Sequence, residues 1–277
     1  MKVLFWNICK KSNFFDTIAN IVIEEDVDIL ALAEFPKEKG ANRNSLIEKI
    51  AAKGKVFSYL EPVVANEKVE LFYRDDRVTI HNKKDNGRFH AKEVIGNDEL
   101  PYTLVFCHMK SKFGSDDFEL DSDANEFCTA LREYETHDAK HKRTIVCGDF
   151  NVEPFSPAMV NAQNFHATMN IHIANNEYRK IRSKSYDYFY NPMWNLLGDG
   201  MIGKPSGSYY HKTNDFHQYF WKMIDQVIIR PDVIGKFNLD ELKVLSGGDS
   251  FNLINDKHQI DSINYSDHLP ITFTLNI

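Results

Sequence analysis

The first 34 residues, MKVLFWNICKKSNFFDTIANIVIEEDVDILALAE, decide the fold class of this chain. They begin with a short, continuous apolar run over residues 2–7, which is typical of a strand in a sheet covered on both faces. Apolar side chains then recur at helical spacing from Phe14 to Val22, and residues 28–34 form a second apolar run that ends in the carboxylate of Glu34. This order predicts a β-α-β unit at the start of an α/β protein.

The rest of the chain continues the alternation of apolar strands and amphipathic helices, with a β-rich middle. We expect strands over residues 56–59, 69–73, 78–81, 88–95, 102–108, 144–149, 223–230, 241–245 and 271–275, and helices over 45–53, 122–140 and 158–163. Residues 166–222 lack a clear period, and we expect long loops with short elements there. Because no repeat or linker-like stretch interrupts the pattern, we predict a single domain over residues 1–277.

Composition excludes several classes of protein. Hydrophobic residues make up 43% of the 277 residues and charged residues 26%, which are ordinary globular values. The formal charge of -7 gives no global positive field, so contact with nucleic acid must be local or assisted by a metal ion. No apolar run reaches the roughly 18 residues of a membrane span, and the apolar N-terminus stops at Lys10 and Lys11, too short for a secretory signal. We therefore expect a cytoplasmic protein.

The four cysteines, Cys9, Cys107, Cys128 and Cys147, are widely spaced. Their spacing matches neither a zinc site nor a dense disulfide framework. Most lie in or beside apolar runs, where cysteine usually behaves as a small hydrophobic residue. We expect free and mostly buried thiols.

Polar residues recur where the apolar runs end. Asn7 follows VLFW, Glu34 follows ILALA, His108 follows LVFC, Asp149 follows IVCG, and Asp225 lies inside MIDQVII. Ligand sites of layered α/β proteins gather where strand ends and their loops converge, so these side chains can share one cleft. One such residue alone is more often a turn former, but the recurrence favours a common site.

Six short motifs in a fixed order resemble the endonuclease/exonuclease/phosphatase superfamily of metal-dependent phosphoesterases. The motifs are WN (Trp6 and Asn7), AE (Ala33 and Glu34), CHMKSK (107–112), GDFN (148–151), IDQV (224–227) and SDH (266–268). The resemblance spans residues 3–275 and implies a two-sheet, four-layer, deoxyribonuclease-like α/β sandwich with its active site at one end. The Tyr-x-Pro-Asn stretch of abasic-site endonucleases is absent at 107–110, which disfavours that branch.

The resemblance implies a Mg²⁺ site, with Mn²⁺ as an alternative ion. Glu34 matches the principal metal ligand, and Asn7 and Asp267 match positions near the same ion; Asn7 is also one of the catalytic positions. Oxygen donors of this kind suit Mg²⁺, which needs only one or two carboxylates and keeps several waters. Taken without the other motifs, Glu34 is better explained as a partly exposed carboxylate that caps a helix or pairs with Lys37.

The resemblance also implies the catalytic groups. Asp149 matches the general base that activates water, and Asn151 matches a stabiliser of the transition state. Asp225 and His268 match an Asp-His pair, in which the carboxylate fixes the imidazole and leaves its other N–H for the phosphoryl oxygens. His108 matches a second phosphate-facing histidine.

Three further residues are candidate substrate-binding positions. Glu67, in EKVELFYR, is the best match for the glutamate that partners His108 in the deoxyribonuclease branch. Lys110 and Lys112 follow His108, and lysines beside the site favour a polyphosphate or nucleic-acid backbone, although a solvated charge run explains them equally well.

A basic run, RKIRSK at residues 179–184, precedes an aromatic-rich stretch that contains Tyr186, Tyr188, Phe189, Tyr190 and Trp194. Cations can meet phosphates while aromatic rings stack on bases, so the segment can bind a single strand or a groove. The alternative is a basic loop followed by packed aromatic residues.

Three functions remain open at this stage. The first is a Mg²⁺-dependent phosphodiester hydrolase, a nuclease cleaving DNA or RNA by attack of an Asp149-activated water; the resemblance implies a 5' phosphate product. The alternative enzyme is a phosphatase or phospholipase-like phosphodiesterase that acts on a small molecule or a lipid headgroup. The salt concentration should barely affect its binding of substrate. The third is a catalytically silent binding module, which the filled catalytic positions do not support.

Overall fold

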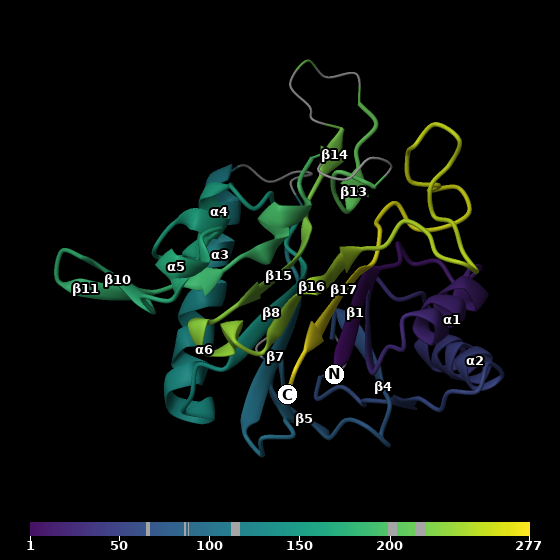
Figure 1. The fold of residues 1–277 in the computed structure, drawn as a ribbon, viewed down its shortest axis with the longest axis horizontal. Coiled ribbons are helices and arrows are strands. Elements are labelled where there is room, and N and C mark those ends of the chain that lie inside the picture. The colour runs from purple at the N-terminus through teal and green to yellow at the C-terminus, as the bar shows by residue number, and fades with distance from the viewer. Residues whose placement is uncertain are drawn as a thin grey trace. The chain divides into compact units, whose positions relative to one another are not determined.

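The computed structural model of the chain describes residues 1–64, 67–85, 87, 89–111, 117–198, 204–213, 216 and 220–277. The chain divides into two compact units. Unit 1 comprises residues 1–79, 198–222 and 238–277, and unit 2 comprises residues 80–197 and 223–237. Each unit contains one large mixed sheet with its own helices (Figure 1). The single domain over residues 1–277 stays a prediction.

Unit 1 is built on a sheet that has six strands over the described residues, in the order β16-β17-β1-β2-β4-β3. The bounds are β1 (Lys2–Asn7), β2 (Ile29–Ala33), β3 (Ser58–Tyr59), β4 (Val69–Tyr73), β16 (Phe237–Val244) and β17 (Ile271–Leu275). The short strands β13 (Tyr209–Tyr210) and β14 (Trp221–Lys222) form a separate pair. β1 lies parallel to β2 and antiparallel to β17, and Asn7 is level with Ala33, so β1 and β2 end side by side.

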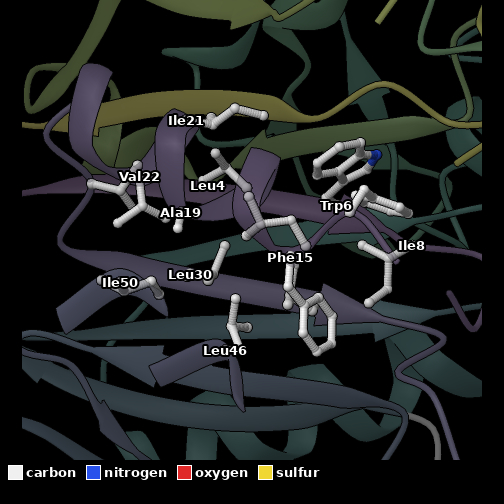
Figure 2. Packing of buried hydrophobic residues seen from close by; sticks show 14 of the residues in the cluster. Leu4, Trp6, Ile8, Phe15, Ala19, Ile21, Val22, Leu30, Leu46 and Ile50 are labelled. Atoms are coloured by element: carbon white, nitrogen blue, oxygen red, sulfur yellow. The ribbon is translucent and has the colours of Figure 1, made fainter. Parts of the chain in front are cut away.

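The predicted β-α-β opening is confirmed. Helix α1 (Phe15–Glu24) connects β1 to β2 and packs against α2 (Lys39–Ala51). In Figure 2, Leu4 and Trp6 of β1 lie in one apolar cluster with Phe15 of α1 and Leu46 of α2. Burial of each such side chain contributes roughly 1.5–3 kcal/mol before the cost of ordering the chain is counted.

Unit 2 is built on a second sheet, whose described strands follow the order β5-β6-β7-β8-β15-β12-β9. The bounds are β5 (Ile80–Asp85), β6 (His90–Ile95), β7 (Pro101–His108), β8 (Thr144–Asp149), β9 (Ala167–Thr168), β12 (Phe189–Tyr190) and β15 (Asp225–Ile229). A separate two-stranded ribbon consists of β10 (Tyr178–Ile181) and β11 (Lys184–Asp187). β8 lies between β7, to which it is parallel, and β15, to which it is antiparallel.

The helices of unit 2 are short apart from one. They are α3 (Asp117–Glu133), the π-helix η1 (Tyr134–Ala139) that continues it, α4 (Pro157–Val160), α5 (Ile171–Ala174), the 3₁₀-helix η2 (Pro192–Leu196) and α6 (Pro231–Ile234). Phe127 of α3, Phe150, Phe165 and Phe189 of β12 contribute aromatic rings to the core of this unit. Residues 166–222 contain short elements, as expected.

Several predicted boundaries were wrong: the expected helix 122–140 begins at Asp117, and the expected strand 241–245 begins at Phe237. Two further errors have identifiable reasons. Helix α2 begins at Lys39, not at Ser45, because its first residues, KGANRN, are almost without apolar side chains and give no hydrophobic period. β5 extends to Asp85 through polar residues because it is an edge strand, where charged side chains are usual.

The structure describes all four cysteines, and none of them forms a disulfide, as expected. Cys107, Cys128 and Cys147 are buried, whereas Cys9, which follows the end of β1 at Asn7, is only half-buried. Within the described part of the chain, no helix has the length and apolar character needed to cross a membrane.

A buried carboxylate in unit 1 makes stability depend on pH. Glu70 of β4 lies 2.5 Å from Lys39 Nζ and 2.7 Å from Arg43 Nη2, and it accepts a hydrogen bond of 2.6 Å from Tyr59 Oη. Burial opposes ionisation of Glu70, but hydrogen bonds from Lys39, Tyr59 and Arg43 outweigh it and lower the pKa. A depressed carboxyl pKa stabilises the folded state above the unfolded pKa of about 4.3, and this stabilisation is lost as pH falls through the folded pKa.

We expect Glu70→Gln to lower the free energy of unfolding at pH 7 by about 1.5–3 kcal/mol, because hydrogen bonds to a charged group are lost. The difference from the native chain should shrink as pH falls below the unfolded pKa of about 4.3 and through the lower folded pKa, because the native carboxylate becomes protonated there. Urea unfolding at pH 7 and pH 3 measures both values, with the exposed Glu48→Gln on α2 as the matched control. A difference that is the same at both pH values would contradict the assignment.

Candidate active site

In unit 1, the ends of β1 and β2 hold a buried amide beside a carboxylate. Asn7 is the last residue of β1, and Glu34 follows directly after β2. Asn7 Nδ2 donates to Glu34 Oε1 at 3.3 Å, and the backbone N–H of Cys9 donates to Asn7 Oδ1 at 3.1 Å. Both ends of the amide are therefore held, and Asn7 orients one oxygen of Glu34.

The backbone around this carboxylate is strained. Cys9, Lys10 and Glu34 have φ angles of 49°, 57° and 49°, in the left-handed region that residues other than glycine rarely adopt. Each costs about 1–3 kcal/mol, and such strain clusters at functional sites. The Lys10 N–H donates to Glu34 O at 2.8 Å, and Lys10 Nζ lies 3.7 Å from Glu34 Oε2. Lys10, rather than the Lys37 considered from the sequence, is thus a cationic neighbour of Glu34.

The SDH loop is fastened to the same strand end. Ser266 Oγ donates to Asn7 O at 2.5 Å and accepts from the His268 N–H at 3.1 Å. Trp6 Nε1 donates to His268 O at 2.8 Å. The ring of Tyr209, which the sequence did not single out, lies 4.8 Å from the His268 ring. These contacts fix the backbone that carries Asp267 and His268.

The thiol of Cys9 lies beside the Asp267 carboxylate. Burial and the neighbouring Asp267 carboxylate, with which the thiol forms a hydrogen bond, raise the pKa of Cys9 to about 11. The thiol is therefore protonated at neutral pH and can donate to the carboxylate. We call Asn7, Glu34, Asp267 and His268 the Glu34 set. Its two carboxylates and one amide are hard oxygen donors around one strand end, a donor type that fits Mg²⁺.

In unit 2, three polar side chains lie level with one another across three adjacent strands. Asp149, the last residue of β8, is paired with His108 of β7 on one side and with Asp225 of β15 on the other. Residues level with one another on neighbouring strands point to the same face of a sheet, so the three side chains share a face. His108 Nε2 lies 3.7 Å from Asp149 Oδ2. Two carboxylates directly opposite each other destabilise a sheet, so this pair makes the row a candidate functional site.

Asn151 contacts Asp149 from the turn that follows β8. The strand ends at Asp149, and Asn151 lies beyond it with a φ angle of 55°. Its backbone N–H donates to Asp149 Oδ1 at 2.9 Å, and its side-chain amide donates to Met109 O at 3.0 Å. The backbone of Asn151 therefore orients the carboxylate, and its side chain ties this turn to the residue after β7. We call His108, Asp149, Asn151 and Asp225 the Asp149 set.

Gly148 allows the strands of the Asp149 set to approach. A Cβ atom at this position would lie 2.0 Å from Cys107 O, so any side chain would push β7 and β8 apart just before His108 and Asp149. The glycine of GDFN is thus required by packing.

A buried pair of side-chain amides, from Asn191 and Gln226, supports the turn that follows β8. Asn191 Nδ2 donates to Gln226 Oε1 at 2.8 Å, and Gln226 Nε2 donates to Val152 O at 2.7 Å. Both amides are fully buried. The sequence indicated Gln226 only as part of the IDQV motif, and no motif or periodic pattern marked Asn191.

The three candidate substrate-binding residues, Glu67, Lys110 and Lys112, lie in different parts of the chain. Glu67 is buried in unit 1, and its pairing with His108 of unit 2 stays a prediction, as does the pair of Asp225 and His268. Lys110 is exposed and lies 3.0 Å from Asp123 Oδ2. Lys112 lies outside the described residues.

The basic and aromatic segment separates into two parts. Tyr188, Phe189 and Tyr190 are buried, as the packing alternative expected, and the ring of Phe189 lies 3.8 Å from the Arg230 guanidinium carbon. The basic part, residues 179–184, forms most of the β10–β11 ribbon and is exposed apart from Ile181.

Solved structures similar to this chain include three that match nearly its whole length. TDP2 from D. rerio, complexed with single strand DNA product, has a TM-score of 0.60 at 12% identity, over 100% of this chain and 99% of that chain. The endonuclease domain of TRAS1, a telomere-specific non-LTR retrotransposon, has a TM-score of 0.55 at 12% identity, and the match covers 100% of this chain and 98% of that chain. An endonuclease/exonuclease/phosphatase family protein from Bacteroides thetaiotaomicron has a TM-score of 0.57 at 12% identity, and the match covers 99% of this chain and 97% of that chain.

No protein-family model matches the sequence, and no curated protein does. The structural matches show that the chain has the fold of the endonuclease/exonuclease/phosphatase superfamily, as the motifs implied. The expected α/β class with two sheets is confirmed.

Proposed function

We propose that this chain is a metal-dependent phosphodiester hydrolase that cleaves nucleic acid, with both residue sets acting on one phosphodiester. The observation that carries the proposal is the row of His108, Asp149 and Asp225 across three strands, with Asp149 oriented by the Asn151 N–H. Such a row places a base, a second carboxylate and an imidazole on one face. The fold, shared with an endonuclease domain, supports the same reaction class.

Glu34 and Asp267 would hold Mg²⁺, or Mn²⁺ in its place, and Asn7 would orient Glu34 and stand near the ion. When bound, the ion neutralises charge that develops on the phosphoryl and leaving oxygens. Lys10, beside Glu34, adds positive charge at the same strand end. The hydrogen bonds from Asn7 Nδ2 to Glu34 Oε1 and from the Lys10 N–H to Glu34 O would hold this carboxylate before substrate arrives, against the strain of its left-handed backbone.

Asp149 would take a proton from water as the water oxygen forms its bond to phosphorus and the bond to the leaving oxygen breaks. The Asn151 N–H donates to Asp149 Oδ1 and so orients the carboxylate for this transfer. His108 and His268 would donate N–H groups to the phosphoryl oxygens, with Asp225 as the partner of His268. A 3' leaving oxygen and a 5' phosphate product follow from the resemblance to the superfamily.

A panel of substrates tests the proposal. Plasmid DNA, single-stranded DNA, RNA, bis-p-nitrophenyl phosphate, sphingomyelin and an inositol phosphate are each offered with Mg²⁺ or EDTA. We expect cleavage of at least one polynucleotide that requires Mg²⁺. Cleavage confined to lipid or inositol phosphates would favour a phosphatase or phospholipase-like enzyme over a nuclease. No cleavage of any substrate with Mg²⁺ would overturn the proposed Mg²⁺-dependent hydrolase.

We expect Glu34→Gln to raise the Mg²⁺ concentration for half-maximal rate by at least about tenfold, because it removes charge from a ligand while keeping its shape. His268→Ala should instead lower turnover and leave that concentration unchanged. Initial rates across a Mg²⁺ titration measure both quantities. Identical titration curves for Glu34→Gln and the native chain would contradict the ligand assignment.

A further inference from the structure

A two-stranded ribbon in unit 2 carries a concentration of positive charge that the proposed reaction does not use. Strands β10 and β11 pair only with each other over the described residues, and the ribbon extends away from α5 and the seven-stranded sheet in Figure 1. We call residues 178–187 the basic arm. It contains Arg179, Lys180, Arg182 and Lys184, all exposed.

These four cations are available to a ligand. Among the residues that the structure describes, none of the four side chains forms an ion pair or a hydrogen bond. Many other lysines and arginines are paired, as Lys83 is with Glu93 at 2.8 Å and Lys84 with Asp138 at 2.7 Å. In a chain of formal charge -7, four unpaired cations within six residues form a local positive site.

The base of the arm is fixed, whereas its tip is exposed. His166 lies 4.0 Å from Tyr188 in a stacked ring contact, and its Nδ1 lies 3.1 Å from Tyr186 O. Burial lowers the pKa of His166, so the neutral ring donates its Nδ1–H to that carbonyl. Lys142 Nζ donates to Asp187 Oδ2 at 2.8 Å. These contacts therefore hold the base of the arm, and the four cationic residues lie farther along it, towards and at the turn.

The cations occupy both faces of the ribbon and its turn. Arg179 is paired with Tyr186, and Lys184 with Ile181, so these four side chains share one face. Lys180 lies on the opposite face. Arg182 occupies the turn with a φ angle of 55°, where glycine or asparagine would be less strained.

We propose that the basic arm binds the phosphate backbone of a nucleic acid. Cations on both faces and at the turn suit a ligand that carries phosphates on either side of the ribbon, as the walls of a DNA groove do. A two-stranded ribbon has the width that the major groove of B-DNA admits. A flat anionic membrane would engage one face, and Tyr178 is the only large apolar side chain of the arm that is exposed. The inference rests on the proposed function, to which the arm would add contacts with the phosphate backbone of the polymer.

Binding is measured by fluorescence anisotropy with a labelled duplex oligonucleotide in EDTA, so that no cleavage occurs. The arm variant carries Arg179→Gln, Lys180→Gln, Arg182→Gln and Lys184→Gln. The control variant carries the same charge change at Lys83→Gln, Lys84→Gln, Lys140→Gln and Lys236→Gln, all in unit 2. Circular dichroism and thermal unfolding verify that both variants fold.

At about 0.1 M salt we expect the arm variant to bind at least tenfold more weakly, and the slope of log affinity against log salt to become shallower by up to about 4. The control variant should bind nearly as tightly as the native chain. Hydrolysis of bis-p-nitrophenyl phosphate should be unchanged in the arm variant, because the four substitutions leave the side chains of both residue sets intact.

An arm variant that binds duplex as tightly as the native chain, or no more weakly than the control variant, would overturn the inference. So would a loss of binding to phosphatidylserine vesicles with binding to DNA retained. These outcomes are distinct from failure of the proposed function, which shows as absence of metal-dependent hydrolysis in the native chain, whatever the arm binds.

Discussion

Asp149→Asn should lower kcat for phosphodiester hydrolysis by about 10²–10⁴-fold, the usual contribution of a general base. The asparagine keeps the shape of the side chain and can still accept the Asn151 N–H through its amide oxygen, a bond of 2.9 Å in the native chain. It cannot take a proton from water at neutral pH. Asp149 is 1% exposed, so the near-isosteric change should preserve the packing of β8.

The matched control is Asp138→Asn, the same chemical change at an exposed carboxylate of η1 in unit 2. Steady-state kinetics on bis-p-nitrophenyl phosphate and on a polynucleotide measure kcat for both variants. Asp138→Asn should match the native rate. A native rate in Asp149→Asn would remove this residue from the mechanism.

Glu135→Ala should lower the free energy of unfolding by about 3–5 kcal/mol, the usual cost of breaking a buried ion pair. Glu135 Oε1 and Oε2 accept from Arg230 Nε and Nη2 at 2.9 and 2.7 Å, and both side chains are almost fully buried. Burial opposes the charge on Arg230, and Glu135 offsets it, so the net effect raises the pKa of the guanidinium. In the variant, the guanidinium keeps only the Tyr188 carbonyl, at 3.1 Å, among the hydrogen bonds described for it.

The double variant Glu135→Leu, Arg230→Met distinguishes two contributions to the free energy of unfolding. One is the cost of leaving Arg230 buried without its carboxylate, and the other is the net contribution of the ion pair. Apolar residues of similar volume replace both charges, so it should recover most of the lost stability. Urea unfolding followed by circular dichroism measures all three proteins. A loss below about 1 kcal/mol in Glu135→Ala would show that the guanidinium finds other partners or water.

The sequence was most informative where apolar periodicity and chain order coincide. The run 2–7, the helical spacing after it and the run 28–34 predicted β1, α1 and β2, because a strand buried on both faces must be apolar throughout. The polar residue that ends each run marks the level where the strand leaves the core. This is why Asn7 and Glu34 lie together in unit 1, and His108 and Asp149 in unit 2.

Contacts between distant residues could not be predicted in this way. Arg230 and Glu135 are 95 positions apart, and neither interrupts a visible pattern. Asn191 and Gln226 are 35 positions apart and meet only because β12 and β15 are neighbours. Tyr209 lies against His268 through a single bridge between short segments. Such pairs depend on the completed fold, and a single sequence carries no period that marks them.

The left-handed residues are a second feature that sequence reasoning missed. Glu34 and Asn151 occupy this region at the ends of β2 and β8, and Cys9 and Lys10 do so after β1. Glycine or asparagine would predict such a turn, but only Asn151 is of that kind. The strain is therefore visible only in the structure, where it coincides with both residue sets.

The central claim is that the Glu34 set and the Asp149 set serve one metal-dependent hydrolysis. The most direct test is the initial rate of bis-p-nitrophenyl phosphate hydrolysis across a Mg²⁺ titration for the native chain, Glu34→Gln, Asp149→Asn and the double variant. We predict a native rate that rises with Mg²⁺ and is abolished by EDTA, a loss of about tenfold or more in Glu34→Gln at subsaturating Mg²⁺, a loss of about 100-fold or more in Asp149→Asn, and a double variant no slower than the slower single variant. A rate that persists in EDTA and is the same in all four proteins would contradict the claim.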